Sequence, residues 1–380
     1  MRNFIMICVV NFCLYFSTYL TMISGTNYAK IALGASTSTA GLVTLLYILG
    51  LIFSTLVFGK FIDSINLKKA LFIVMGLDVV VTFCYLVANS THILLFLRVL
   101  TGVLFGIGTS ICNTTISKII PESKKGVGIG YYNMSVIISS AISPFFAIKF
   151  NASGLYKESF LLATTAFVVS VLAILFMNLK EIENSCTATK KEFRVSDFIE
   201  PKALPIATIV LIAGFSYGGV LAFLSLYTQS LNLSFAGSIY YPFYSVFALI
   251  SVWVYGKLFD IKKENLAYML SLLAFFISLI LLSTASSSFD ILASAFFLAF
   301  GWASSKSLAQ TIAIKLSPEN RVGLANSTFF IFVNLGIGIS PYVLGLVEPI
   351  VGFSGVYQIS ALALILGAIL YYLLVWKNFK

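Results

Sequence analysis

Long apolar runs dominate the chain, and short polar segments separate them. A helix needs about 20 apolar residues to cross the hydrocarbon core of a bilayer, and the 380 residues divide into twelve runs of that kind. The runs are continuous rather than alternating, which favours helices over the strands of a membrane barrel. The pattern predicts membrane-spanning helices at residues 4–24, 39–59, 69–89, 93–117, 126–149, 157–178, 205–228, 236–256, 265–285, 290–313, 322–347 and 353–376.

The composition agrees with an all-α integral membrane protein. Hydrophobic residues make up 59% of the chain and charged residues 10%, with a mean hydropathy of +1.00, whereas soluble domains carry about 25% charged residues. The first run occupies the place of a signal peptide. Its apolar stretch exceeds the usual length of about 7–15 residues, so we interpret it as the first span.

The basic residues indicate the orientation of the chain. The formal net charge is +10, which would also suit a protein that binds nucleic acid. With the N-terminus inside, nineteen Lys and Arg residues fall in inner segments and three in outer loops. The positive-inside rule accounts for this asymmetry, so we expect a cytoplasmic (inner) membrane protein with both termini in the cytoplasm and no nucleic-acid partner. The five cysteines show no framework spacing, and neither disulfides, a metal nor a cofactor is predicted.

The two halves of the chain share motifs at one fixed offset. "FGKFIDSINLKK" (58–69) and "YGKLFDIKKEN" (255–265) place the same Gly-Lys-x-x-Asp pattern 197 residues apart, and "KIIPESKKG" (118–126) aligns with "KLSPENRVG" (315–323) at the same offset. We therefore predict two pseudo-symmetric six-helix bundles, in residues 1–179 and 204–380, joined by a cytoplasmic linker at 180–203. Repeats of this kind are expected to hold a substrate site between them near mid-membrane.

This duplicated pattern resembles the major facilitator superfamily over essentially the whole chain, in the exporter branch with its proton-coupled drug and metabolite antiporters. The loop between spans 2 and 3 is the strongest likeness. The family pattern there is Gly, three residues, Asp, a basic residue, any residue, Gly and further basic residues. Ser64 and Leu67 replace basic residues of the pattern, and Asn66 replaces its second Gly. The Asn66 replacement is physically mild, because asparagine tolerates the left-handed conformation that a turn Gly would supply.

The resemblance assigns this loop to an inner gate. It implies that Asp63 bonds to the N-terminal end or the basic residues of a neighbouring helix and so latches one conformation. The alternative is that the charges of the loop only set topology. The prolines of spans 5 and 11 are expected to kink their helices. The predicted gating residues are Gly59, Asp63, Lys68, Lys69, Gly256, Asp260, Pro144 and Pro341.

Residues without a counterpart in the other half are the candidates for chemistry. Arg98, in "FLRVLTGVLFGIG" (96–108), corresponds to Ala295. A charge inside a span is costly and marks a pathway by default. The segment also resembles the helix-4 motif of the family, with Thr101 where a polar Gln is usual, which implies that Arg98 and Thr101 line the substrate cavity. The alternative is that Arg98 snorkels to the outer interface.

Span 10 carries a second unmatched cation. Trp302, Lys306 and Gln310 of "AFGWASSKSLAQ" (299–310) fall on one helical face, in a span that lines the cavity of the family. Two cations facing a cavity favour a substrate with a carboxylate or phosphate, and Trp302 offers a stacking surface. Lys306 could instead snorkel toward the cytoplasm. The remaining predicted substrate-binding residues are Asn11, Tyr15 and Tyr217, of which the two in span 1 suit helix packing equally.

Asp78, in "MGLDVVVT" (75–82), is the carboxylate placed well inside a span. A carboxylate removed from water takes up a proton more readily, as proton coupling requires. Asp78 and Arg98 are therefore the predicted proton-coupling residues. Asp78 could instead simply pair with Arg98 or bond to neighbouring backbone, since the third span is usually peripheral in the family fold.

Together these features predict a monomeric secondary transporter that works by alternating access, with proton-coupled export of a small amphipathic or anionic organic compound as the preferred activity. The helix-5 antiporter signature is degraded, because Ser143 stands where a Gly usually precedes the proline, and uptake or facilitated diffusion of an organic anion is the alternative. A membrane enzyme is disfavoured, since no Walker loop or Gly-x-Ser-x-Gly elbow is present. A receptor is disfavoured because no sizeable soluble domain exists.

Overall fold

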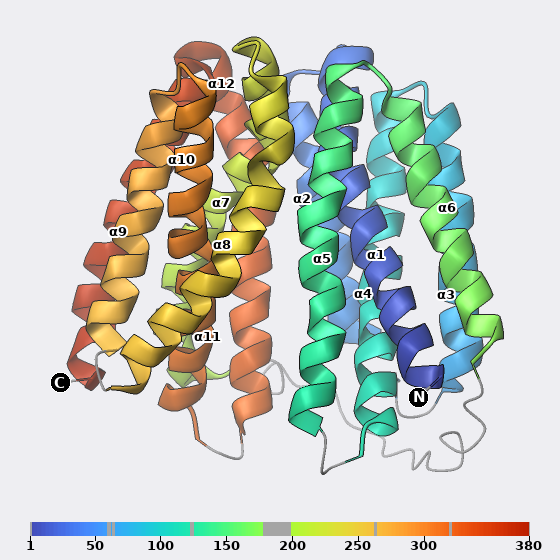
Figure 1. The fold of residues 1–380 in the computed structure, drawn as a ribbon, viewed down its shortest axis with the longest axis horizontal. Helices are drawn as coiled ribbons and strands as arrows, with labels where there is room; N and C mark the ends of the chain where they lie inside the picture. Colours follow the sequence, from blue (N-terminus) through green and yellow to red (C-terminus); the bar gives the residue numbers. More distant parts are fainter. Residues whose placement is uncertain are drawn as a thin grey trace. The chain divides into compact units, whose positions relative to one another are not determined.

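The computed structural model describes residues 2–58, 62, 65–121, 125–177, 199–261, 264–318 and 321–379. In these ranges eleven helices are long and apolar enough to cross a membrane, and no strand occurs. The chain divides into two compact units (Figure 1). The first comprises Met1–Ala35 with Leu46–Glu192, and the second comprises Ser36–Leu45 with Phe193–Lys380.

The first unit is built around α1. This helix packs against α4, α5 and α6, and α3 packs against α4 and α6; these are the blue to green ribbons of Figure 1. The π-helix η1 (Tyr28–Ala32) prolongs α1, and the 3-10 turn η3 (Tyr85–Val87) prolongs α3. The helices are α1 (Arg2–Asn27), α2 (Thr37–Phe58), α3 (Leu67–Cys84), α4 (Thr91–Ile119), α5 (Lys125–Ala152) and α6 (Tyr156–Leu175). The part of α2 up to Leu45 belongs to the second unit.

Glycines bring α2 and α4 into backbone contact. A Cβ added at Gly102 would lie 2.0 Å from the carbonyl oxygen of Tyr47, and one added at Gly50 would lie 2.5 Å from the carbonyl oxygen of Val99. Small residues at such crossings let helices approach closely inside a membrane, where packing rather than hydrophobic burial drives association. This contact places Tyr47 beside the helix that carries Arg98.

The second unit contains two irregular spans. α10, the π-helix η8 and α11 follow one another without a break as the span Ser288–Leu316. α12 contains two helices, because Gly352 has φ 68° and ψ 176°, a conformation essentially restricted to glycine. Counting both parts of α12 gives twelve spans in the described part of the chain, and the predicted all-α fold is confirmed. The elements are α7 (Leu204–Ser230), α8 (Ser234–Asp260), α9 (Glu264–Ser283), α10 (Ser288–Leu298), η8 (Ala299–Ala303), α11 (Ser304–Leu316) and α12 (Val322–Leu374).

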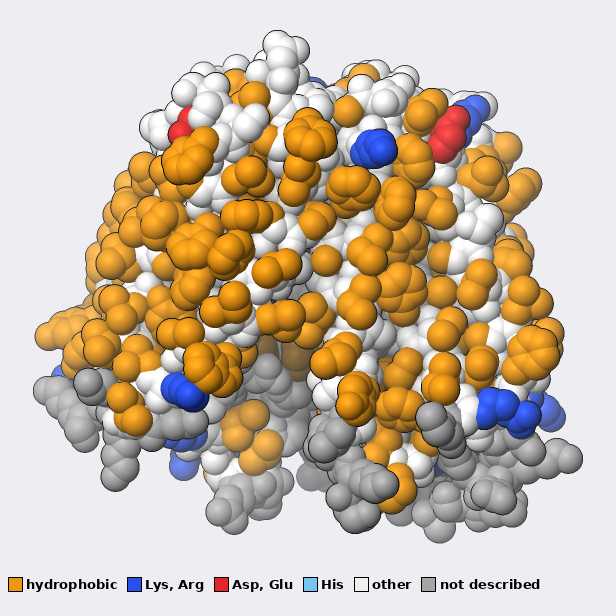
Figure 2. All heavy atoms as spheres, viewed as in Figure 1, with side chains coloured by type: hydrophobic (Ala, Val, Ile, Leu, Met, Phe, Trp, Pro, Cys, Tyr) orange, Lys and Arg blue, Asp and Glu red, His pale blue; other side chains and the backbone are white. Residues whose placement is uncertain are grey.

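Apolar side chains cover the outer sides of the helices. Phe53, Trp253 and Leu362 are each more than 60% exposed, at 64%, 61% and 64%. On the face drawn in Figure 2, such side chains occupy the middle of the helices, and the blue and red charged side chains lie near the helix ends. A surface of this kind suits contact with lipid rather than water, as expected for a multi-pass membrane protein.

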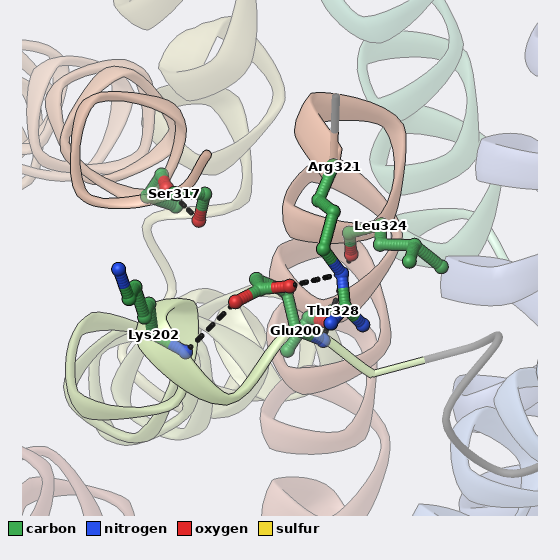
Figure 3. Close-up of polar contacts among 7 residues, drawn as sticks. Glu200, Lys202, Ser317, Arg321, Leu324 and Thr328 are labelled. Carbon is green, nitrogen blue, oxygen red and sulfur yellow. Dashed lines mark hydrogen bonds and ion pairs between the residues drawn. The ribbon is translucent and has the colours of Figure 1, made fainter. Parts of the chain in front are cut away.

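A buried ion pair holds the segment before α7 against the start of α12 (Figure 3). The Glu200 carboxylate is 3% exposed and lies 2.7 Å from Nε of Arg321. Its other oxygen accepts the backbone N–H of Lys202 at 3.2 Å. The backbone N–H of Glu200 donates to Oγ1 of Thr328 at 2.8 Å. These contacts join α7 and α12 at one end of the second unit.

Replacing Arg321 with glutamine should lower the stability of the protein by about 1–3 kcal/mol, because the Glu200 carboxylate would stay buried without its cation. Thermal melting of the purified protein in detergent measures the change. Lys202→Gln is the matched control, since Lys202 bonds to Glu200 through its backbone N–H, which the substitution keeps. Equal melting temperatures for the two variants would contradict this account of the ion pair.

Candidate functional site

Arg98 lies at the centre of a polar cluster in the first unit. Its side chain is 0% exposed, so it does not extend to the outer interface. Nη1 donates to Oγ1 of Thr21 in α1 at 3.1 Å, and the guanidinium carbon lies 4.8 Å from the centroid of the Tyr47 ring in α2. A cation over an aromatic face is attracted by the negative face of the ring. Arg98 thereby connects α4 with both α1 and α2.

Thr101 lies one turn after Arg98 and is 1% exposed. Its Oγ1 lies 2.8 Å from the hydroxyl of Tyr85 and donates to the carbonyl of Leu97 at 2.8 Å. Tyr85 is fully buried, and its ring stacks on Phe160 of α6 at 5.2 Å with an interplanar angle of 28°. The sequence interpretation missed Tyr85, although its position seven residues after Asp78 on the same helical face is a usable signal.

Asp78 is fully buried in α3. Among the described residues, neither of its carboxyl oxygens has a hydrogen-bond partner. The neighbouring Thr82 hydroxyl donates to the backbone carbonyl of Asp78 at 2.6 Å, not to its side chain. Asp78 and Arg98 both lie close enough to Tyr85 to act electrostatically on its hydroxyl. The two predicted proton-coupling residues thus have Tyr85 as a common neighbour.

The two candidates of α1 differ in their surroundings. Asn11 is 0% exposed, donates to Oγ of Ser135 at 2.7 Å and accepts from the hydroxyl of Tyr132 at 2.8 Å. Both partners belong to α5, so the Asn11 amide serves helix packing here. Tyr15 is half-buried, and its ring meets the edge of Phe105 at 5.1 Å and 81°.

Tyr217 and Trp302 form an aromatic pair in the second unit. Their ring centroids are 4.5 Å apart with an interplanar angle of 11°. Trp302 is 4% exposed and also lies 6.0 Å from the ring of Phe275 in α9, whereas Tyr217 is only half-buried. In this conformation Tyr217 is the more accessible ring of the pair, and it stacks on the buried ring of Trp302.

Trp302 belongs to the π-helix η8, which the sequence interpretation did not predict. π-Helical turns free a backbone carbonyl and are frequent at functional sites. Here Oγ of Ser251 in α8 donates to the carbonyl of Ala299 at 2.8 Å and accepts from Oγ of Ser304 at 3.1 Å. A Cβ at Gly301 would lie 2.4 Å from Cα of Phe275. Contacts from α8 and α9 therefore hold the turn.

Lys306 and Gln310 follow in α11, and both are half-buried. The Gln310 amide donates to Oδ1 of Asn326 in α12 at 2.6 Å, so it links two helices of the second unit. Lys306 lies one turn after Trp302. The second unit therefore carries a cation close in sequence to an aromatic pair, and the first unit carries a cation enclosed by polar and aromatic side chains.

The start of α2 packs within the second unit. Oγ1 of Thr37 donates to the carboxylate of Glu348 at 2.6 Å. A Cβ at Gly41 would lie 2.2 Å from the carbonyl oxygen of Pro341, and one at Gly345 would lie 2.7 Å from Cα of Ser38. The predicted gating residue Pro341 thus lies in α12 at a backbone-to-backbone contact with α2.

Most of the loop between α2 and α3 is outside the described residues, including Gly59 and Asp63, as is the side chain of Asp260. Lys68 donates to the backbone carbonyl of Met177. Asn66 does not use the left-handed conformation that a Gly could supply, because it has φ −72° and ψ 105° and caps α3 by accepting the backbone N–H of Lys69 at 2.9 Å. A side-chain cap needs extended backbone, which explains the difference. The gating candidates Lys69, Gly256 and Pro144 lie in α3, α8 and α5.

Comparisons with known proteins agree on one family. A model described as Major Facilitator Superfamily matches residues 7–320. An uncharacterized MFS-type transporter of Methanocaldococcus jannaschii is 23% identical over 380 residues, covering 95% of this chain and 97% of the relative.

Solved transporters share the fold at low sequence identity. The nucleoside transporter NupG has a TM-score of 0.82 at 12% identity, covering 98% of both chains. A bacterial homolog of the human lysosomal transporter Spinster has a TM-score of 0.78 at 12% identity, covering 98% of this chain and 96% of the homolog. A POT family transporter in complex with 5-aminolevulinic acid has a TM-score of 0.77 at 14% identity, with coverages of 100% and 97%.

Proposed function

The chain belongs to the Major Facilitator Superfamily, and we propose from this premise that it exports a small amphipathic or anionic organic compound in exchange for protons. It is a multi-pass membrane transporter of small molecules and not an enzyme. The similar structures carry names that range from nucleoside to peptide transporters. The shared fold therefore selects no substrate, and the proposal depends on this chain's own residues.

The observation that carries proton coupling is the state of Asp78. Its carboxyl group is fully buried and has no hydrogen-bond partner among the described residues. A buried carboxylate without partners costs several kcal/mol when ionised, and protonation removes that cost. This conformation therefore suits the protonated form, and the ionised form requires another arrangement. Release of the proton and a change of conformation are linked in this way.

The polar and aromatic residues of both units support an anionic or amphipathic substrate. Lys306 would attract a carboxylate or phosphate, and the half-buried ring of Tyr217 would contact an apolar part of the compound. Arg98, held by Thr21 and Tyr47, would supply the second positive charge when the first unit rearranges. We assign Trp302 a supporting role behind Tyr217.

The remaining assignments follow from the distribution of charge and from the repeated motifs. We propose a monomer in the cytoplasmic membrane with both termini on the cytoplasmic side, in accordance with the positive-inside rule. The loop of Gly59 and Asp63 would close the inner side. The loop of Gly59 and Asp63 follows the end of α2. At the start of α2, the contact of Thr37 with Glu348 would stabilise one conformation of this helix.

A comparison of metabolites identifies the substrate. Cells that lack the protein should accumulate a compound that cells overproducing the protein release into the medium. Arg98→Ala and Lys306→Ala should each abolish this release at unchanged protein level. Flux into right-side-out vesicles separates export from uptake, and net entry of the compound down its gradient, without proton movement, would replace the proposal with facilitated uptake of an organic anion.

A further inference from the structure

Tyr85 occupies the place where the environments of Asp78 and Arg98 meet. It begins the 3-10 turn η3 at the end of α3, is 0% exposed and has its ring fixed against Phe160. Its hydroxyl lies 2.8 Å from Oγ1 of Thr101 and also interacts with the side chain of Arg98. A tyrosine buried this deeply in a span usually needs a partner for its hydroxyl.

The direction of this hydrogen bond follows from the second contact of Thr101. A threonine hydroxyl carries one hydrogen, and that of Thr101 points to the carbonyl of Leu97 at 2.8 Å. Tyr85 must then be the donor and Thr101 the acceptor. The Tyr85 hydrogen is therefore directed toward Thr101 of α4, one turn from Arg98, and not toward the carboxyl group of Asp78.

Asp78 lies about two helical turns before Tyr85, a rise of about 10 Å at 1.5 Å per residue. Helical side chains lean toward the N-terminus of their helix, so the Tyr85 ring leans toward Asp78. No described residue donates a hydrogen bond to either oxygen of Asp78, and an ionised carboxylate in this place needs a donor.

We propose that Tyr85 is the positioning residue that connects proton release at Asp78 to movement of the Arg98 cluster. When Asp78 gives up its proton to solvent, the Tyr85 hydroxyl turns from Thr101 to the new carboxylate, directly or through one water. Tyr85 keeps its own proton, so only the acceptor of its hydrogen bond changes. Thr101 loses a donor one turn from Arg98, and the contacts of Arg98 with Thr21 and Tyr47 are then free to rearrange.

This inference depends on the proposed proton coupling and assigns it a residue and a hydrogen bond. The ionisable groups around Tyr85 are Asp78 on α3, Arg98 on α4, and the tyrosines that pack near Phe160. Tyr28 lies 5.6 Å from the Phe160 ring and 5.8 Å from the ring of Tyr156, and its hydroxyl donates to the carbonyl of Ala88 at 3.0 Å. Tyr28 is therefore a matched control, buried beside the same ring with its hydroxyl on backbone.

Infrared difference spectra of the full-length protein in lipid, recorded while the pH is raised, test the change of the Tyr85 hydrogen bond from Thr101 to Asp78 without any substrate. Loss of the carbonyl stretch of a protonated carboxylic acid reports the ionisation of a carboxyl group. If this signal is absent in Asp78→Asn, the band belongs to Asp78. We expect a tyrosine C–O band to change at the same pH. That change should be lost in Tyr85→Phe and in Asp78→Asn but retained in Tyr28→Phe.

Two results would overturn the assignment to Tyr85. The carboxyl band of Asp78 could titrate with no tyrosine change, or with a tyrosine change that persists in Tyr85→Phe. In both cases Asp78 remains the proton site, and the proposed change of the Tyr85 hydrogen bond is wrong. If no carboxyl band depends on Asp78, the proton site and the change of the Tyr85 hydrogen bond fail together. Tyr85→Phe keeps the ring on Phe160, so its melting temperature should match that of Tyr28→Phe.

Discussion

Gly102→Ala should melt at a clearly lower temperature than the unchanged protein. The new Cβ would lie 2.0 Å from the carbonyl oxygen and 2.8 Å from the carbonyl carbon of Tyr47, and both are backbone atoms that cannot move aside alone. α2 and α4 must separate, and overpacking of this kind costs about 1–3 kcal/mol or more. The separation also shifts the Tyr47 ring away from Arg98, so transport should fall together with stability.

Gly76→Ala provides the matched control for this substitution. Gly76 also lies inside a helix, α3, but a Cβ there would meet nothing within 4 Å. Alanine is the better helix former by about 0.5–1 kcal/mol, so this variant should melt at the same temperature or higher. An equal fall in both variants, or no fall in Gly102→Ala, would show that the contact between α2 and α4 is not as tight as described.

Arg98→Ala should abolish transport of the compound that the metabolite comparison identifies. A hydrogen bond to a charged group contributes about 1.5–3 kcal/mol, so losing the contacts to Thr21 and Tyr47 should by itself reduce the rate at least about tenfold. The substitution also removes the second positive charge of the proposed substrate site. Arg98→Lys should not restore it, because an ammonium group cannot reproduce a planar guanidinium that bonds and stacks at once. The measurement is the initial rate of efflux, normalised to the amount of protein in the membrane.

Lys149→Ala is the control for the loss of a positive charge from the same unit. Lys149 is exposed near the end of α5, with Nζ 5.8 Å from the Phe145 ring, and its removal should leave the rate unchanged. Normal efflux in Arg98→Ala would remove Arg98 from the transport mechanism. Reduced efflux in both variants would point to a general effect of charge on the membrane protein instead.

The helices were predictable because the thickness of the bilayer sets the length of each apolar run. The separation of the last two spans was predicted between residues 347 and 353, and the break at Gly352 lies there. The π-helix at Trp302 was not predictable in the same way. It depends on Ser251 from α8 and on the close approach of Phe275 from α9, and the sequence around Trp302 does not predict either contact.

The residues of the candidate site also divide into those that the sequence identifies and those that it does not. Arg98 and Asp78 stand out because a charge within an apolar run is costly and therefore rare. Tyr85 and Thr21 do not stand out, since tyrosine and threonine are common in the spans of this chain. Helical spacing predicted that Trp302 and Lys306 share one face of their helix, but spacing does not tell how deeply each side chain is buried. The observed burial of Trp302 comes from its stacking on Tyr217 and from the tilted ring of Phe275 beside it.

Proton movement in proteoliposomes tests the central claim most directly. The purified protein is reconstituted with a pH indicator inside the vesicles, and the compound identified in cells is added outside at neutral pH. We predict that the compound moves protons across the membrane in the direction opposite to its own, that a protonophore removes its accumulation, and that Asp78→Asn moves the compound without protons. Accumulation that persists with the protonophore, or transport by the unchanged protein with no pH change, would contradict the account.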